Sequence, residues 1–339
     1  MKALVLEEPG KAVLKRIEEP IVAAQDEILL QVRMVGLCGS DLNSYRGRNP
    51  MVSYPRIPGH EVSATVADLN SNHAEWQPGT PVTLSPYTNC GRCASCLRGR
   101  PNACQFNQTL GVQRDGALTE FIAVPASRLY RADLTLKELC LVEPLTVGFH
   151  AVARGRVEKA DTVAVFGCGG VGLGVVAGAA FRGATVIGVD LDDAKLATAR
   201  KAGAARTINA ANGDLHSQLL ELTDGRGPDV VIEAIGLPQT FRAAVEEVAF
   251  TGRVVYIGYA KEQVPYETRL FVQKELDILG SRNALPEDFR EVIRMLEAHR
   301  FPVDEAVTHI VPLEEAPAIL EAWNQEPARF TKIMIEIAS

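Results

Sequence analysis

Hydrophobic and polar residues alternate in short runs over the first ~135 positions of the chain. Each run has the period of two that a strand with one buried face requires, and glycine, proline or asparagine separates it from the next. The runs are KALVLE, AVLKRIEE, EILLQVRMVG, EVSATVADL, PVTLSP and LTEFIAV. Such short, frequently interrupted strands predict a loop-rich, barrel-like domain rather than a parallel sheet.

The pattern changes near residue 145, where the strands become short and almost wholly apolar. They are TVAVFG, ATVIGVD, RTINA, DVVIEAIG, RVVYIGYA and ELDILGS. Helical segments such as 192–204 and 240–250 lie between them. Strands buried on both faces and alternating with helices predict a doubly wound parallel sheet, and therefore an α/β protein. From residue 286 the tail adds helical stretches at 286–300 and 313–325 and a final strand at 330–338.

Length, charge and apolar content narrow the class of protein. A chain of 339 residues is long enough for about two domains. The net charge of −7, from 35 basic and 42 acidic residues, gives no basic surface for nucleic acid or an anionic membrane. The N-terminus lacks the apolar core of a signal peptide, and the most apolar stretch, 171–180, is too short to span a bilayer. We therefore expect a cytoplasmic protein.

A glycine-rich turn joins the first apolar strand of the second region to a helix. Its sequence, G-C-G-G-V-G, fits the G-x-G-x-x-G pattern of dinucleotide sites, and Asp190 ends the next strand. Glycines let the backbone approach a pyrophosphate, and the helix N-terminus offers amides to it. The predicted cofactor contacts in the turn are Gly167, Gly169, Gly170, Val171 and Gly172.

Asp190 favours NAD over NADP, because a carboxylate accepts hydrogen bonds from the ribose hydroxyls and repels a 2′-phosphate. No arginine follows it; the next residues are Leu191, Asp192 and Asp193. Two alternatives remain open from the sequence. The glycine turn could serve packing alone, and Asp190 could be the N-cap of the following helix.

Four of the seven cysteines lie within the fifteen residues CGRCASCLRGRPNAC. The spacing C-x2-C-x2-C-x7-C suits a tetrahedral zinc site, and four thiolates leave no position for a substrate. The sequence therefore predicts a structural zinc at Cys90, Cys93, Cys96 and Cys104. The alternatives are a disulfide pair, a redox switch or an iron–sulfur cluster; a reducing compartment disfavours the disulfide.

Catalytic chemistry then needs a second site, and three further segments offer metal ligands. MVGLCGSDLN contains Cys38, IPGHEVSATV contains His60 and Glu61, and LVEPLTVGFHA contains Glu143. A thiolate, an imidazole and a carboxylate leave an open position on zinc for water or an alcohol. Taken singly, Cys38 could be a small buried hydrophobic residue and His60 an ordinary core or surface histidine.

The ordered set of motifs resembles the zinc-dependent medium-chain dehydrogenases. It comprises C-G-S-D-L, G-H-E, the four-cysteine segment, E-P-L and G-C-G-G-V-G, and it covers nearly the whole chain. The resemblance implies a GroES-like β-barrel catalytic domain, residues 1–148 and 286–339, and an inserted Rossmann NAD-binding domain, residues 149–285. It also implies a homodimer or homotetramer.

The resemblance also assigns roles near the second metal. Cys38 and His60 resemble the catalytic zinc ligands, and Glu61 is either a ligand or a close partner of one. Glu143 stands where alcohol dehydrogenases of the family carry cysteine, and a glutamate there is similar to the sorbitol (polyol) dehydrogenase branch. Whether Glu61 or Glu143 binds the resting metal stays open.

Further roles follow from the same resemblance. Asp41 resembles the carboxylate that orients His60, and Ser40 resembles the hydroxyl that takes the proton from the alcohol. The family often has a histidine three residues after this serine to end a proton relay. Here Asn43 stands instead, and it does not titrate near neutral pH. Proton exit through Glu143, the cofactor ribose or water is expected in its place.

Substrate contacts are expected at the end of the second domain. Arg282 resembles an arginine that faces the substrate and the cofactor in polyol dehydrogenases; its alternative is a surface or interdomain salt bridge. The segment 280–289 is similar to dehydrogenases of sugar acids such as L-galactonate and L-idonate, and an arginine suits a carboxylate. Gly236 and Gly258 are expected to border the nicotinamide with Arg282. Tyr45 is either a pocket wall or core packing.

The sequence therefore predicts an oxidoreductase with two zinc ions per chain. It uses NAD to oxidise, reversibly, a secondary alcohol of a polyol or aldonate to a ketone. A simple secondary-alcohol or butanediol dehydrogenase, and an L-threonine dehydrogenase, are the alternatives on the same scaffold. The alternative of another class is a catalytically silent nucleotide-binding regulatory protein.

Overall fold

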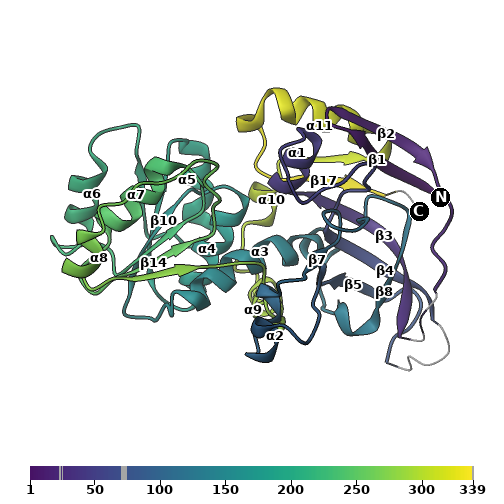
Figure 1. Ribbon diagram of the computed structural model, residues 1–339, viewed down its shortest axis with the longest axis horizontal. Coiled ribbons are helices and arrows are strands. Elements are labelled where there is room, and N and C mark those ends of the chain that lie inside the picture. The colour runs from purple at the N-terminus through teal and green to yellow at the C-terminus, as the bar shows by residue number, and fades with distance from the viewer. Residues whose placement is uncertain (23, 25, 70–74, 338–339) are drawn as a thin grey trace. The chain divides into compact units, whose positions relative to one another are not determined.

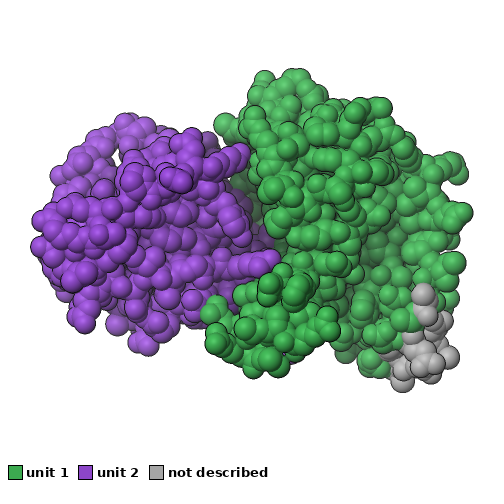
Figure 2. All heavy atoms as spheres, in the orientation of Figure 1, with its two compact units in different colours: residues 1–143, 303–339 green, residues 144–302 purple. Residues whose placement is uncertain are grey.

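Contacts within the chain divide it into two units, which Figure 2 colours separately. We describe the protein from a computed structural model, which covers residues 1–22, 24, 26–69 and 75–337. The first unit comprises residues 1–143 and 303–339, and the second comprises residues 144–302. Among the described residues, none of the helices combines the length and the hydropathy that a bilayer crossing requires.

A seven-stranded sheet forms the centre of the first unit, with strand order β16-β17-β3-β4-β5-β9 and β8 paired with β3. Two smaller antiparallel pairs, β1–β2 and β6–β7, accompany it. The strands are β1 (Lys2–Glu8), β2 (Lys11–Arg16), β3 (Glu27–Leu37), β4 (Glu61–Leu69), β5 (Pro81–Leu84), β6 (Tyr87–Thr88), β7 (Gln108–Thr109), β8 (Phe121–Pro125), β9 (Leu129–Tyr130), β16 (His309–Pro312) and β17 (Ile333–Glu336). Its helices are α1 (Gly39–Tyr45), α2 (Ala94–Leu97), α10 (Val303–Ala306), α11 (Ala316–Gln325) and the first part of α3 (Leu136–Arg154), with 3-10 turns η1 (Pro101–Ala103), η2 (Ala126–Arg128), η3 (Leu313–Glu315) and η4 (Pro327–Arg329).

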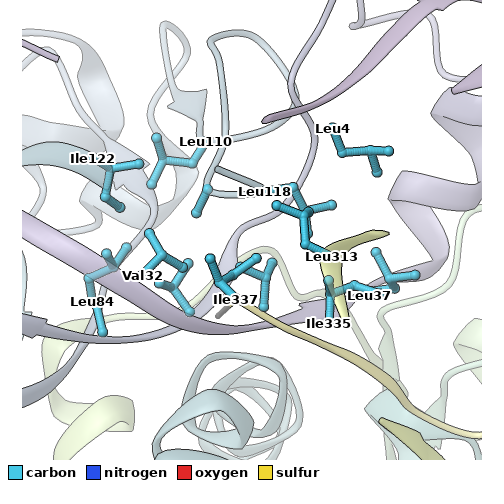
Figure 3. Packing of buried hydrophobic residues seen from close by; sticks show 14 of the residues in the cluster. Leu4, Val32, Leu37, Leu84, Leu110, Leu118, Ile122, Leu313, Ile335 and Ile337 are labelled. Atoms are coloured by element: carbon cyan, nitrogen blue, oxygen red, sulfur yellow. The ribbon is translucent and has the colours of Figure 1, made fainter. Parts of the chain in front are cut away.

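Strand β3 organises this sheet because it pairs with three other strands. Its first half pairs with β8, its last four residues pair with β17, and its other edge pairs with β4. Its side chains alternate between buried and half-buried along most of the strand, as the sequence pattern predicts. Figure 3 shows the core that results, in which Val32 and Leu37 of β3 lie near apolar side chains from distant parts of the chain such as Leu4, Leu118 and Ile335.

The second unit contains a six-stranded sheet in which every pair is parallel. The strand order is β12-β11-β10-β13-β14-β15. The strands are β10 (Thr162–Phe166), β11 (Thr185–Asp190), β12 (Arg206–Asn209), β13 (Val230–Glu233), β14 (Arg253–Tyr256) and β15 (Asp277–Gly280). The helices are α4 (Gly170–Phe181), α5 (Asp193–Lys201), α6 (Leu215–Leu222), α7 (Pro238–Glu247), α8 (Arg269–Gln273) and α9 (Pro286–Glu297). Figure 1 shows α4, α5, α6, α7 and α8 lying around the strands of this sheet.

The order of this sheet creates a switch point between β10 and β13. From β10 the chain proceeds outward to β11 and β12, whereas β13, β14 and β15 extend the sheet on the opposite side. Strands β10 and β13 are neighbours, and the loops that follow their carboxyl ends run in opposite directions along the sheet. In open parallel sheets, ligands bind in the crevice at this place.

Most of the predicted strands are confirmed. Each apolar run named for the second region contains one of the strands β10 to β15. Helix α5 lies within its predicted segment, and α7 overlaps its predicted segment but begins two residues earlier, at Pro238. The final predicted strand is β17, although Ala338 lies outside the described residues. The short strands β6, β7, β9 and β16 were not predicted, because two to four residues carry too little periodic signal.

The boundaries between the two units differ from the predicted domain boundaries, which were 148/149 and 285/286. The units change at 143/144 and 302/303, so α9 lies in the second unit. Its contacts explain this placement. Asp288, near the start of α9, accepts a hydrogen bond from the amide of Leu285 and is 2.8 Å from Nδ1 of buried His150 on α3. Glu291 of α9 pairs with Arg182 after α4.

Candidate active site

Three predicted metal ligands converge at one end of the β3–β4 pair. Cys38 follows β3 and is the N-cap of α1, while His60 and Glu61 stand at the start of β4. The antiparallel register pairs Gly36 with Glu61, which brings the residue after β3 close to the residue before β4. Ligand atoms of Cys38, His60 and Glu61 all lie within 4.8 Å of one another. Adjacent strands have thus brought together motifs that are about twenty residues apart in sequence.

Gly36 makes room for the carboxylate of Glu61. A Cβ built on Gly36 would lie 2.0 Å from Oε2 of Glu61, far inside van der Waals contact. A glycine inside a strand often marks such a close approach. The Glu61 side chain therefore lies over the backbone of β3 at the one position of the strand end that carries no side chain.

Lys332 binds Glu61 from the other side of β3. It directly precedes β17, whose first residue, Ile333, pairs with Leu37. Its Nζ donates to Oε1 and Oε2 of Glu61 at 2.6 and 2.7 Å and to the carbonyl of Leu37 at 3.2 Å. Both side chains are buried, so Lys332 provides the positive charge that offsets the buried carboxylate. No local sequence motif marks Lys332, which was therefore not predicted.

Asp41 lies beside His60 but mainly binds backbone amides. Oδ2 accepts a hydrogen bond from the amide of Cys38 at 2.9 Å, and Oδ1 accepts one from the amide of Gly59 at 3.2 Å. Oδ1 is 3.8 Å from Nδ1 of His60, longer than a hydrogen bond. Asp41 therefore ties the two ligand segments together, and its predicted role in orienting the imidazole stays a prediction.

Ser40 carries a buried hydroxyl next to the ligand segment. Its Oγ is buried and has no hydrogen-bond partner, which is the state expected of a group awaiting a bound molecule. Asn43 lies one turn further along α1 and is half-buried. Of the two roles considered for Tyr45, a pocket wall and core packing, the structure supports core packing. Its side chain is 4% exposed, and its hydroxyl donates a hydrogen bond to Glu321 at 2.6 Å.

Glu143 is a second buried carboxylate near the cluster. It lies in α3, is 3% exposed and accepts a short hydrogen bond from the hydroxyl of Tyr87. Burial raises the pKa of Glu143 to about 7, with nearby His60 opposing the rise. Glu143 is not among the three residues whose ligand atoms lie within 4.8 Å of one another. Tyr87, in a strand of only two residues, was also missed from the sequence.

The donor set fits a zinc ion with an open coordination position. A thiolate, an imidazole and a carboxylate are the ligand types that zinc accepts, and fewer than four protein ligands leave room for a substrate oxygen. The unpartnered Oγ of Ser40 and Nδ1 of His60 add buried polar atoms that the protein itself does not satisfy. These observations fit the predicted catalytic metal.

The four-cysteine segment forms a second cluster of ligands. The sulfur of Cys93 is 3.5 Å from that of Cys96 and 3.8 Å from that of Cys104, and all four ligand atoms lie within 4.8 Å of one another. With Zn–S bonds of about 2.3 Å, a tetrahedral site has sulfurs about 3.8 Å apart, whereas a disulfide needs about 2.05 Å. All seven cysteines are free, so the disulfide alternative is wrong for this structure.

Local hydrogen bonds prepare these sulfurs to act as thiolates. The amides of Cys90 and Phe106 donate to the sulfur of Cys104, each at 3.3 Å. The hydroxyl of Ser95 and two backbone amides lower the pKa of Cys93 to about 5. Burial raises the pKa of Cys96 to about 11. A backbone hydrogen bond from Arg92 also lowers the pKa of Cys90. The segment thus favours the thiolate form at Cys90 and Cys93, and a bound metal would ionise Cys96 as well.

Replacing Cys96 by serine is expected to remove about one zinc ion per chain and to lower thermal stability, because metal binding contributes to the folding free energy. A loss of about 3 kcal/mol would lower Tm by roughly 6–12 °C if the first unit, residues 1–143 and 303–339, unfolds separately, because this shift applies to units of about 150–250 residues. Metal analysis and thermal unfolding provide the measurement. Ser95→Ala, in the same segment, is the control that keeps four sulfurs. A fully stable C96S protein whose only defect is a higher KM would contradict the structural role.

The glycine-rich turn has the close packing that its sequence predicts. Gly167 has φ +94°, and a Cβ on Gly172 would lie 1.8 Å from the carbonyl oxygen of Gly167. Gly169 is the N-cap of α4 and offers no side-chain acceptor, so Gly170 and Val171 begin the helix with free amides. A helix start of this kind attracts a phosphate group.

Asp190 ends β11 beside this turn. Its Oδ2 accepts a hydrogen bond from the amide of Cys168 at 2.8 Å, and its Oδ1 accepts one from the amide of Leu191 at 2.8 Å. The N-cap of α5 is Asp192, whose carboxylate binds the amides of Ala194 and Lys195. The helix-cap alternative for Asp190 is therefore wrong, and its carboxylate instead joins the second strand to the turn.

The remaining predicted contacts lie at the same edge of the sheet. Gly236 follows β13 with φ +86°, and Gly258 follows β14. A Cβ on Gly258 would lie 2.4 Å from the amide nitrogen of Gly236, so the two loops touch. Arg282 follows β15 and is half-buried. Its predicted contact with substrate stays a prediction.

Comparisons with known proteins agree with both units. Residues 24–133 match the alcohol dehydrogenase GroES-like domain, and residues 170–298 match the zinc-binding dehydrogenase family. L-galactonate-5-dehydrogenase of Escherichia coli K12 is 32% identical over 313 residues, 92% of each chain. Sorbitol dehydrogenase of Bacillus subtilis 168 is 32% identical over 346 residues, covering 99% of this chain and 97% of the relative.

A solved structure extends the similarity to three dimensions. An alcohol dehydrogenase of Escherichia coli CFT073, crystallised with NADH, superposes with a TM-score of 0.91 at 27% identity and 99% coverage of both chains. The folds of both units are therefore similar to those of a protein that holds a nicotinamide cofactor.

Proposed function

The chain belongs to the zinc-binding alcohol dehydrogenase family, and on this premise we propose that it oxidises a secondary alcohol of a polyol or sugar acid, reversibly, with NAD. Membership rests on relatives that are 32% identical over nearly the whole chain. It makes the protein a dehydrogenase of the zinc- and nicotinamide-dependent type. The predicted fold class, a GroES-like domain with a Rossmann domain, is confirmed.

The observation that carries the proposal is the convergence of Cys38, His60 and Glu61 beside the unpartnered hydroxyl of Ser40. These residues would hold the catalytic zinc, and the four cysteines of residues 90–104 would hold a second, structural one. When bound, the catalytic ion supplies a Lewis acid that lowers the pKa of a substrate hydroxyl.

The side chains around this position divide the remaining work. Ser40 accepts the hydroxyl proton, because its buried Oγ has no competing partner. Lys332 binds both carboxylate oxygens of Glu61 and so fixes the carboxylate of the ligand cluster. Glu143, a second carboxylate, accepts a hydrogen bond from Tyr87. It is suited to receive or relay the alcohol proton, because Asn43 replaces the histidine that often ends the proton relay in the family.

The preference for NAD over NADP rests on Asp190. Replacing Asp190 by glycine is expected to raise the Kd of NADH about tenfold or more, because a hydrogen bond to a charged group is worth roughly 1.5–3 kcal/mol. The loss of the bond to the amide of Cys168 affects both cofactors alike. The ratio of the NADH and NADPH dissociation constants is therefore the measurement, and an unchanged ratio would remove Asp190 from the ribose.

The experiment that tests the function is NADH formation by the purified, zinc-replete protein. The panel contains hexonates, polyols, 2,3-butanediol, L-threonine and plain secondary alcohols, each repeated with NADP. Highest activity on hexonates would support a carboxylate contact by Arg282. Highest activity on polyols or butanediol would keep the metal chemistry and discard that contact. No turnover of any alcohol, with NADH still bound, would favour a silent nucleotide-binding protein.

Three further parts of the hypothesis stay predictions. They are the two zinc ions per chain, a homodimer or homotetramer, and a cytoplasmic location. Metal analysis of the purified protein and its mass in solution address the first two directly.

A further inference from the structure

Glu233 is a fully buried carboxylate at the carboxyl end of β13, and no sequence motif discussed above includes it. It has no exposed surface. Its Oε1 accepts hydrogen bonds from the amides of Ile235 and Gly236 at 2.9 and 2.7 Å and from the hydroxyl of Thr240 at 2.7 Å. Its Oε2 is buried without a hydrogen-bond partner. One oxygen thus fixes the turn that leads from β13 into α7.

This turn is packed tightly against the loops on both sides of it. A Cβ on Gly167, in the glycine-rich turn, would lie 2.6 Å from the Ile235 side chain. A Cβ on Gly258, after β14, would lie 2.5 Å from Oε2 of Glu233 and 2.4 Å from the amide nitrogen of Gly236. Glu233 therefore lies where the loops after β10, β13 and β14 meet.

These loops border the switch point of the parallel sheet, where a dinucleotide binds. A sheet of this kind has two mononucleotide-binding halves. The half containing β11 ends in Asp190, the acidic residue that suits the adenosine ribose. The half containing β13 and β14 would therefore bind the nicotinamide mononucleotide. Its loops carry the exposed side chains of Ile235 and Tyr259, apolar or aromatic surface on which a planar ring can pack.

We propose that Glu233 is a positioning residue for the nicotinamide half of the cofactor. It acts through the loop 234–237, which its carboxylate holds against the glycine-rich turn and Gly258. The inference rests on the proposed use of a nicotinamide cofactor. A carboxylate is suited to this task because one acceptor oxygen with two lone pairs and a negative charge can bind several amide and hydroxyl donors at once.

Asp229 provides an internal comparison at the opposite end of the same strand. It directly precedes β13, and its Oδ2 accepts a hydrogen bond from the amide of Thr162 at 2.8 Å. Like Glu233, it binds a backbone amide of the second unit, but at the amino edge of the sheet, away from the switch point. Loss of Asp229 is therefore a test of general stability, whereas loss of Glu233 tests the crevice.

The experiment measures cofactor binding by the full-length, zinc-loaded protein. Dissociation constants for NADH and for AMP, which carries only the adenosine half, are compared in the wild type, Glu233→Met, Glu233→Gln and Asp229→Asn. Methionine has a similar length and no strong acceptor, and glutamine keeps one acceptor oxygen. We expect E233M to weaken NADH at least tenfold and AMP less than twofold. E233Q is expected to bind NADH within about threefold of the wild type, and D229N to bind both normally.

Other results would overturn the proposal. Unchanged NADH binding by E233M would do so, as would equal weakening of NADH and AMP, which indicates a general loss of folding. Failure of the wild type to bind NADH would instead reject the proposed function, so the two failures are distinguishable.

A second measurement does not depend on the folding of E233M. Thr240→Val removes one donor to Oε1 and leaves the carboxylate in place, and we expect it to raise the Kd of NADH about threefold without changing that of AMP. Hydrogen exchange of the wild type, without cofactor, should show protected amides at Ile235 and Gly236. Rapid exchange at both positions would overturn the proposed clamp.

Discussion

Cys38→Ser is expected to remove nearly all alcohol oxidation and to lower the zinc content by about one ion per chain, while NADH still binds. The thiolate is one of three converging ligands, and a serine hydroxyl is a much poorer ligand for zinc. Loss of a Lewis acid that contributes roughly 4 kcal/mol slows turnover about 10³-fold. NADH binding survives because the glycine-rich turn and Asp190 belong to the other unit. Initial rates, metal analysis and a fluorescence titration with NADH measure the three quantities.

Cys140→Ser is the matched control for this substitution. Cys140 is also buried in the first unit, and its sulfur donates to the carbonyl of Glu61 at 3.4 Å, a bond that a serine hydroxyl can also make. It is expected to keep its zinc and most of its activity. Wild-type rates in C38S would show that the metal site lies elsewhere.

Lys332→Met is expected to destabilise the first unit by about 3–5 kcal/mol, because it leaves the buried carboxylate of Glu61 without its positive partner. Urea unfolding of the metal-free protein measures this loss. In zinc-loaded protein the loss should be smaller, since a metal ion at Cys38 and His60 supplies positive charge beside the same carboxylate.

The double variant Lys332→Met/Glu61→Gln separates charge from packing. Removing the negative charge as well should recover much of the stability of metal-free K332M, because the buried charge is then gone. If K332M loses less than about 1 kcal/mol of its free energy of unfolding, the Lys332–Glu61 ion pair contributes no more than an ordinary surface salt bridge. No recovery in the double variant would assign the loss to the aliphatic chain of the lysine.

Local patterns in the sequence predicted the features that depend on neighbouring residues. Strands β10 to β15 were found because each is a short apolar run between breaks. The four-cysteine site was found because its ligands lie within fifteen residues. Cys38, His60 and Glu61 were found through short motifs, and the β3–β4 register then explains how these motifs meet.

Features that depend on long-range strand pairing could not be predicted. Lys332 is 271 residues from Glu61, and only the pairing of β17 with β3 brings them together. Gly36 is one of 28 glycines, and its importance comes from the side chain that lies over it. The placement of α9 depends in the same way on the contact between Asp288 and His150, which no local pattern signals.

The position of β17 in the sheet has a consequence for synthesis of the protein. Residues 1–143 leave the ribosome first, but the strand that completes their sheet, and the lysine that neutralises Glu61, are made last. The continuous second unit, residues 144–302, can fold while the first still lacks its edge strands and its counter-charge. Burial of Glu61 before Lys332 has been made would therefore carry the penalty of an unpaired buried charge. Metal captured earlier by Cys38 and His60 would offset this penalty, which links maturation of the chain to the supply of zinc.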